Sequence, residues 1–101
     1  TSSEDYITYQ KGELLDAVYL QQNSFDPIDE ACVPERQRRE FGRLYDAMTK
    51  TYDLSDKREI RAFFNQLRQE FLDWHGTLFE TPEFEAQEKK ITDLYMSKVV
   101  E

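Results

Sequence analysis

Residues 60–74 read IRAFFNQLRQEFLDW, and this stretch decides the fold. Its apolar side chains recur at intervals of three and four residues, the spacing of one face of an α-helix. The members of this stripe are Ile60, Phe63, Phe64, Leu67, Phe71 and Trp74. Burying a large apolar side chain stabilises a fold by about 1.5–3 kcal/mol. We therefore predict that this helix forms the centre of the core.

The boundaries of this helix are marked by polar residues and a glycine. Ser55, followed by Asp56, is predicted to cap its N-terminus, and Gly76 is predicted to end it. Leu78 and Phe79 follow in a loop, and we expect both to tuck under the bundle.

Two further helices are predicted before this one. The first begins at Ser2 or Ser3, which are good N-cap residues, and ends near Asn23. Pro27 disfavours helical geometry in the residue before it, so a loop follows. Pro34 suits the first position of the second helix, where its missing N–H costs nothing. The predicted apolar stripe of that helix is Phe41, Leu44, Tyr45, Met48 and Tyr52.

A fourth helix is predicted to start at Thr81-Pro82-Glu83, which supplies a capping hydroxyl, a proline and a first-turn acid. Its stripe is Phe84, Ile91, Leu94, Tyr95 and Val99. Helices with short connections predict an all-α fold, a small bundle of about four helices that spans residues 1–101 as a single domain. Because the chain begins with Thr1 and shows no export signal, we expect it to be the C-terminal part of a longer chain.

The composition excludes several classes of function. Asp and Glu number 21 against 13 Lys and Arg, which gives a net charge of −8. Binding to nucleic acid requires a basic protein surface, and so does binding to an anionic membrane. The acidic excess of this chain argues against both kinds of partner. No apolar stretch approaches the roughly 20 residues of a membrane span, so direct membrane insertion is not expected. Cys32 is the single cysteine and cannot form an internal disulfide, which favours a reducing, cytoplasmic location.

No residue set indicates catalysis within this chain. The three glycines are scattered and cannot build a phosphate-binding loop. His75 is the single histidine, and we interpret it as a helix-end residue near the negative end of the helix dipole. A thiolate enzyme built on Cys32 would need a base, and only that distant histidine could serve. We therefore predict no catalytic residue and no metal site.

A basic run on the second helix has two interpretations. Its members are Arg36, Arg38, Arg39 and Arg43. Oppositely charged residues four positions apart are typical of a solvated helix face, and the pairs here are Glu35 with Arg39, Arg36 with Glu40, and Asp46 with Lys50. A site for phosphate or for an acidic partner is the alternative.

Residues 20–29, LQQNSFDPID, place three neutral polar residues, an aromatic ring and two acids at the end of the first helix. Phe25 belongs to no apolar stripe. It either plugs the top of the bundle or offers a flat face to a ligand or a neighbouring domain. The pattern alone does not choose between these two interpretations.

This stretch resembles the Leu-Gln-Gln-Asn-x-Phe-Asp-x-x-Asp segment in the catalytic A (alpha) subunit of V/A-type rotary ATPases, where it opens the C-terminal helical domain. The resemblance continues with Cys32, with the helix start Pro-Glu-Arg-Gln at residues 34–37, and with Tyr45-Asp46. It covers residues 1–55. Ser2-Ser3-Glu4-Asp5 is similar to the second half of the acidic turn that bears on the central stalk in that family, although Ser3 stands where an acid is common.

The resemblance implies a role for each of these segments. Phe25 would pack against the adenine of ATP or ADP, and Gln22 and Asn23 would line the edge of that pocket. Glu4 and Asp5 would contact the central stalk. The Mg-nucleotide would be held mainly by the P-loop of a preceding domain, and this fragment would hold no cofactor alone.

The resemblance also implies an assembly and a motion. The partners would be neighbouring B subunits and central-stalk subunits, in a membrane-bound complex that couples ATP hydrolysis or synthesis to proton or other ion transport. The domain would swing as a rigid body with nucleotide occupancy and push the stalk. Two other readings are a free-standing helical module that binds a protein partner and an independent small enzyme, for which no coherent residue set exists.

Overall fold

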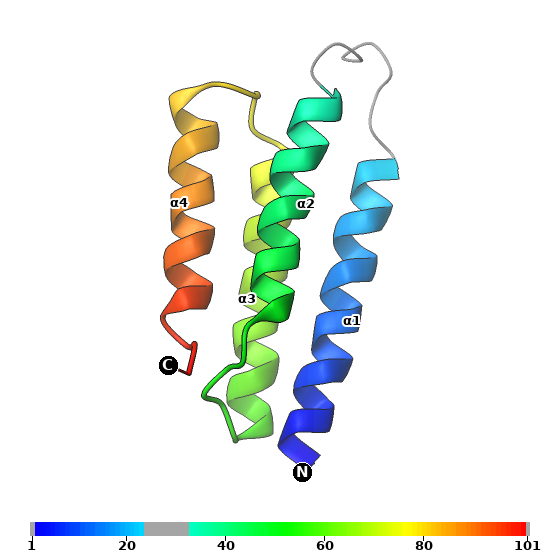
Figure 1. The fold of residues 1–101 in the computed structure, drawn as a ribbon, viewed down its shortest axis with the longest axis vertical. Helices are drawn as coiled ribbons and strands as arrows, with labels where there is room; N and C mark the ends of the chain where they lie inside the picture. The colour runs from blue at the N-terminus through cyan, green and yellow to red at the C-terminus, as the bar shows by residue number, and fades with distance from the viewer. Residues whose placement is uncertain (1, 24–32, 101) are drawn as a thin grey trace.

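The computed structural model describes residues 2–23 and 33–100. These residues form four helices, α1 (Ser2–Asn23), α2 (Val33–Thr49), α3 (Lys57–His75) and α4 (Pro82–Met96). The helices lie side by side and alternate in direction in a bundle that measures 45 Å along its longest axis (Figure 1). The predicted all-α bundle of about four helices is confirmed.

Two predicted helix starts differ by one residue from those observed. α3 is capped by Asp56, whose carboxylate accepts a hydrogen bond from the Arg58 N–H at 2.9 Å, so the prediction of Ser55 as the cap was wrong. Both residue types are good caps, and the path of the preceding loop selects between them. Ser2 and Ser3 already belong to α1, so they occupy its first turn instead of capping it.

The remaining helix boundaries follow the sequence signals. Gly76 ends α3, and its N–H donates to the Leu72 carbonyl at 3.3 Å. The Thr81 hydroxyl accepts from the Phe84 N–H at 3.2 Å, and Pro82 takes the first position of α4. These boundaries are fixed by local chemistry, which is why the sequence predicts them well.

The core is centred on α3, as predicted. All six residues of its apolar stripe are buried, and the most exposed of them, Phe63, retains 6% of its surface. α1 and α4 both pack against α3 more extensively than against any other helix. The other fully buried large residues include Leu14 from α1, and Phe84, Ile91 and Tyr95 from α4.

The predicted inward face of α2 was partly wrong. Tyr45 is 72% exposed, and Tyr52 lies beyond the end of the helix at Thr49, although its ring is buried. The residues of α2 that are buried follow one helical line, and they are Arg36, Glu40, Leu44 and Ala47. Two of these buried residues are charged. A prediction that uses apolar residues alone therefore assigns the buried face of α2 to the wrong side, the one that contains Tyr45.

The loop after α3 splits the two residues that were expected to tuck under the bundle. Phe79 packs edge-on against Phe84, with ring centroids 5.0 Å apart, which confirms the prediction for that residue. Leu78 is 73% exposed, so the prediction for Leu78 was wrong. Consecutive residues of a short loop point in different directions, and one of the two faces solvent.

Across residues 2–23 and 33–100, no helix has the length and apolar character needed to cross a membrane.

Candidate functional site

α1 separates the two segments that were predicted to make functional contacts. Glu4 and Asp5 are exposed in its first turn, and the backbone of Gln22 and Asn23 forms its last turn. A helix rises 1.5 Å per residue, so Glu4 and Asn23 are roughly 28 Å apart along the axis. The structure therefore places these segments at opposite ends of the bundle (Figure 1). Phe25, and the side chains of Gln22 and Asn23, lie outside the described residues.

A cavity of about 410 Å³ lies beside the acidic end of α1. The first three turns of α1 form one wall, and residues 51–55, which connect α2 to α3, form the other. Glu4 and Asp53 contribute carboxylates to the lining, and Ile7 and Leu54 contribute apolar surface. Sequence reasoning found Glu4 but missed the second wall, because nothing in the pattern of residues 51–55 indicates that they approach α1.

Lys11 forms part of this cavity and is held against the wall. Its Nζ donates to the Lys50 carbonyl at 2.8 Å and lies 5.5 Å from the centroid of the Tyr52 ring. Burial lowers the pKa of Lys11. The ammonium group is thus positioned by a carbonyl and an aromatic face, which both favour a cation.

The wall formed by residues 51–55 is itself anchored to the end of the chain. The Asp53 N–H donates to the Lys98 carbonyl at 2.7 Å, and the Val100 N–H donates to the Thr51 carbonyl at 2.8 Å. Tyr52 between them is 5% exposed, and its hydroxyl donates to the Ala47 carbonyl. Backbone pairing and a buried ring therefore hold this segment in place.

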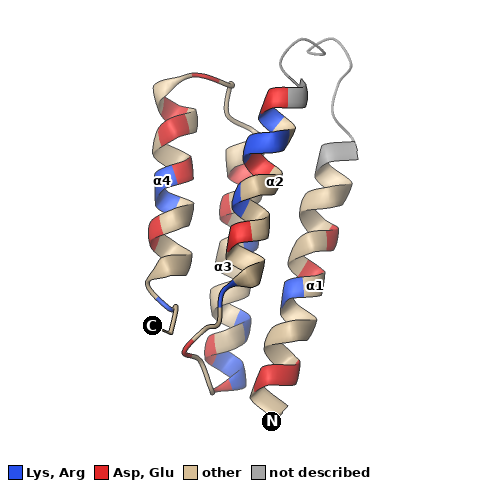
Figure 2. Cartoon of the chain, viewed as in Figure 1, with Lys and Arg blue, Asp and Glu red and all other residues tan. Residues whose placement is uncertain are grey.

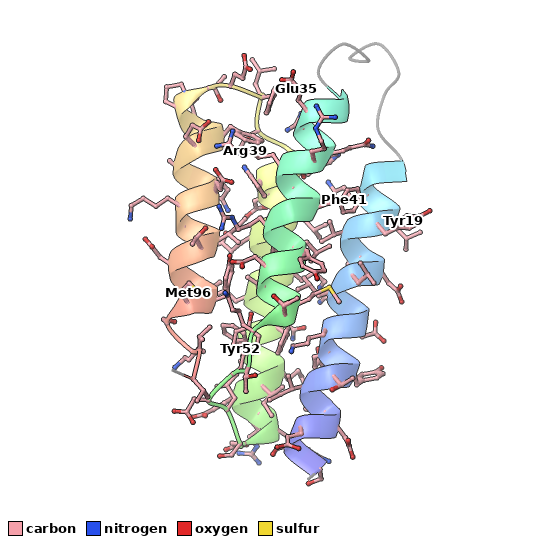
Figure 3. The ribbon with its side chains drawn as sticks, viewed as in Figure 1. Tyr19, Glu35, Arg39, Phe41, Tyr52 and Met96 are labelled. Atoms are coloured by element: carbon pink, nitrogen blue, oxygen red, sulfur yellow. The ribbon has the colours of Figure 1, made fainter. Side chains whose placement is uncertain are left out.

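The arginines of α2 form the predicted solvated face only in part, because Arg38 and Arg39 are exposed but Arg36 is buried. Arg39 reaches across to α4, where its Nη2 lies 2.7 Å from Glu85 Oε2 and 2.7 Å from Glu88 Oε1. Figure 2 shows basic positions along α2 and acidic positions along α4, and Figure 3 shows Arg39 on the side of α2 that faces α4. Arg43 Nη2 lies 3.4 Å from Glu88 Oε2. The expected pairing of Arg39 with Glu35 was wrong, since α4 offers carboxylates at better-placed positions. These arginines join α2 to α4.

A phenol and a carboxylate also join α2 and α4, near the C-terminal ends of both helices. Tyr95 on α4 donates to Asp46 on α2, and Arg43 Nη1 donates to the Tyr95 hydroxyl oxygen at 3.2 Å. The hydrogen bond from Tyr95, together with the nearby Lys50 and Arg43, holds the pKa of Asp46 below its usual value. The predicted pairing of Asp46 with Lys50 is confirmed at 3.2 Å.

Replacing Tyr95 with phenylalanine is expected to lower the free energy of unfolding by roughly 1 kcal/mol at pH 7, the size of a hydrogen bond to a partly exposed charge. A depressed pKa stabilises the fold fully above the unfolded value of about 4, and this contribution disappears as the pH falls through the folded value. The difference between Tyr95→Phe and the parent should therefore shrink below about pH 4. Urea titrations at pH 7 and pH 3 test this, and a pH-independent difference would contradict it.

A buried charged cluster ties the start of α2 to the end of α3. Glu40 is 1% exposed, and its carboxylate lies 3.0 Å from Arg36 Nε and 3.1 Å from His75 Nδ1. Arg36 also donates to the carbonyls of His75 and Thr77. The predicted pair of Arg36 and Glu40 is confirmed, and His75 is the last residue of α3 as predicted. The approach of His75 to Glu40 was missed, because the two residues are far apart in sequence.

The cluster of Arg36, Glu40 and His75 connects α2 to α3 and has a structural role. Each of its side chains is oriented by a partner inside the bundle, and Glu40 is enclosed between two helices. Within the described ranges, no group of three or more His, Cys, Asp or Glu side chains could hold a metal ion.

The amino-acid sequence that forms this bundle is similar to part of an ATP synthase subunit. The relatives are V-type ATP synthase alpha chains. That of Borrelia turicatae (strain 91E135) is 46% identical over 94 residues, which are 93% of this chain and 16% of the relative. Those of Borrelia hermsii (strain HS1 / DAH) and Borrelia garinii subsp. bavariensis (strain PBi) are 44% and 42% identical over 96% and 98% of this chain.

These relatives confirm the resemblance predicted from residues 1–55 and extend it to nearly the whole chain. The chain spans about a sixth of the length of the curated relatives it matches, 16% or 17%. No family model matches the chain. No solved structure matches it either.

Proposed function

We propose that this four-helix bundle is the C-terminal helical domain of the catalytic A (alpha) subunit of a V/A-type rotary ATPase. The observation that carries the proposal is identity of 42–46% to V-type ATP synthase alpha chains over 93–98% of the chain. In that role the domain contributes a lever and one wall of the adenine pocket, while the catalytic groups lie in another domain of the same subunit. Its partners are the neighbouring B subunits and the central-stalk subunits, in a complex at the cytoplasmic face of a membrane.

A lever must transmit a displacement from one end to the other without bending, and the contacts of the bundle support this. α3 is packed by α1 and α4 along its length, and the ion pairs of Arg39 and Arg43 fasten α2 to α4. Close-packed interiors transmit strain instead of absorbing it. A change at the end of α1 near Asn23 would therefore move the end near Glu4 and Asp5 as part of one body.

The coupling follows from where the two ends lie. The segment after Asn23 carries Phe25, which we propose as the apolar face against which adenine rests, with Gln22 and Asn23 at the edge. A domain that contacts the base in only one of its positions shifts the population toward that position when ATP or ADP, with Mg, is bound elsewhere in the subunit. The opposite end then presses on the stalk through Glu4 and Asp5, which links ATP turnover to rotation and ion transport.

Replacing Phe25 with alanine in the full subunit is expected to weaken nucleotide binding about tenfold. Stacking of a base on an aromatic ring contributes about 1–3 kcal/mol, and 1.4 kcal/mol is a factor of ten in affinity. Equilibrium binding of a fluorescent ATP analogue measures the change. Phe25→Trp serves as the matched control and should retain affinity. Unchanged affinity in Phe25→Ala would remove the adenine role and return Phe25 to packing in the bundle.

A further inference from the structure

We propose that an open apolar groove between α1 and α2 is covered, in the full subunit, by an amphipathic α-helix of the same polypeptide that lies outside residues 1–101. This inference rests on the proposed function, since it takes the bundle to be one domain of a longer catalytic subunit. It assigns a partner to a surface that neither the nucleotide contact nor the stalk contact uses.

The groove is a cavity of about 350 Å³ with an apolar lining. Its lining residues are Leu15 from α1 and Phe41, Leu44, Tyr45 and Met48 from α2. Leu44 is 2% exposed, whereas Leu15 is 40% and Tyr45 is 72% exposed. Figure 3 shows Phe41 on the side of α2 that faces α1. Because none of the lining side chains is charged, the groove favours an apolar guest.

The sequence pattern of α2 indicates that the groove is covered in the complete protein. The four lining residues of α2 follow one another at intervals of three, one and three, which places them on a single helical face. A continuous apolar face on a helix is normally buried against another element. In this bundle Phe41 and Met48 are half-buried and Tyr45 is exposed, so the pattern predicts a further covering element.

The sequence of α1 supports the same conclusion. Three of its apolar residues, Ile7, Leu14 and Val18, are buried in the bundle. Four others remain 40–68% exposed, and they are Tyr9, Leu15, Tyr19 and Leu20. Successive residues of a helix are turned by about 100°, so these four do not share one face. A helix with apolar residues on several sides is typical of the interior of a larger protein.

The remainder of the subunit offers the best occupant. This chain covers 16–17% of its relatives, so about five-sixths of their length lies outside it. A segment of the same polypeptide has a high effective concentration, so a modest apolar contact is enough to hold it in place. A helix fits a groove between two helices, since its side chains at intervals of three and four residues enter such a groove. A second copy of this chain is disfavoured, because each copy carries a charge of −8.

Cysteine labelling in the purified full subunit, without B or stalk subunits, tests whether the groove is covered. Tyr45→Cys and Leu78→Cys are a matched pair, because these side chains are 72% and 73% exposed in the bundle and Leu78 lies in the loop between α3 and α4. Tyr45→Cys is expected to react with N-ethylmaleimide about tenfold more slowly, since a covered thiol reacts only when its cover opens. Mass spectrometry of each peptide measures the rates, which should become similar in denaturing urea.

Photocrosslinking in the same subunit identifies the occupant. A p-benzoylphenylalanine at Tyr45 is expected to crosslink within one polypeptide, to a peptide outside residues 1–101 that carries leucine, isoleucine, methionine or phenylalanine at the contact. The control position is Ala86, an exposed residue of α4, and a probe there should not give this product. Replacing the crosslinked apolar residue with aspartate should bring the labelling rate of Tyr45→Cys up to that of Leu78→Cys.

Failure of this inference can be told apart from failure of the proposed function. If the full subunit binds nucleotide but Tyr45→Cys and Leu78→Cys react at the same rate, the groove is open and only this inference is wrong. If the Tyr45 probe crosslinks only a second copy of the subunit, the proposed occupant is wrong. If the reading frame holds no nucleotide-binding domain, the proposed function fails and the occupant fails with it.

Discussion

Replacing Trp74 with alanine is expected to lower the free energy of unfolding by about 4 kcal/mol, because it empties the largest fully buried site in the core. Trp74 is 0% exposed on α3, its ring centroid lies 5.0 Å from that of Phe84, and its Nε1 donates to the Phe84 carbonyl at 3.0 Å. The substitution removes this packing together with the hydrogen bond from the indole N–H to the Phe84 carbonyl. Such a loss is a large part of the 5–15 kcal/mol that stabilises a typical domain.

Two further variants serve as comparisons, one at Trp74 and one at an exposed aromatic residue. Trp74→Phe keeps one six-membered aromatic ring but removes the rest of the indole, including its N–H, so we expect a loss of about 2 kcal/mol. Tyr19→Ala removes an aromatic ring that is 55% exposed and should change stability by less than about 0.5 kcal/mol. Guanidinium titrations followed by circular dichroism at 222 nm measure all three. A loss below about 1 kcal/mol for Trp74→Ala would show that α3 is not the centre of the core.

Replacing Glu40 with leucine is expected to destabilise the bundle by about 3 kcal/mol, although leucine is a good core residue. The reason is the partner that remains, since Arg36 is 6% exposed and would keep its charge after losing the Glu40 carboxylate. Removing one member of a buried ion pair typically costs about 3–5 kcal/mol. We expect the lower end of this range, because Arg36 also donates to the carbonyls of His75 and Thr77.

The double substitution Arg36→Met and Glu40→Leu is the matched control for this prediction. It removes both charges and fills the space with apolar atoms, so it should be more stable than Glu40→Leu alone by 1 kcal/mol or more. Urea titrations measure the double variant and the two single variants, Glu40→Leu and Arg36→Met. If the losses of the single substitutions simply add in the double variant, Arg36 and Glu40 are not energetically coupled.

Features that depend on residues close to one another in the sequence could be predicted from it. The stripe of α3 is read from intervals of three and four residues, and all six of its members are buried. The cap of α4 at Thr81 and the end of α3 at Gly76 are set by atoms within four residues. Local chemistry of this kind survives folding, because tertiary contacts have little reason to overrule it.

Features that depend on which helices meet could not be predicted in the same way. The inward line of α2 contains Arg36 and Glu40, and no hydrophobic pattern would place two charged residues in a core. Arg39 pairs with Glu85 and Glu88 because α4 packs beside α2, a fact that sequence spacing does not contain. The cavity wall at Asp53 likewise exists only because residues 51–53 pair with the end of the chain.

The same distinction applies to the candidate site, where the sequence contains the short motifs but not their positions in the fold. The functional contacts of Glu4 and Asp5, and of the segment from Gln22 to Phe25, are predicted from a resemblance, which matches short motifs. Their separation along α1 required the observation that α1 is one helix from Ser2 to Asn23. The proposed lever needs this separation, because its contact with nucleotide and its contact with the stalk would lie at different ends.

The reading frame that encodes this segment offers the decisive measurement. If the bundle is the C-terminal domain of a rotary ATPase catalytic subunit, sequencing upstream of the codon for Thr1 should reveal several hundred further residues. They should include Gly-x-x-x-x-Gly-Lys followed by Ser or Thr, the loop that cradles the phosphates of a bound nucleotide. A frame that starts close to Thr1 and contains no such loop would contradict the proposed function.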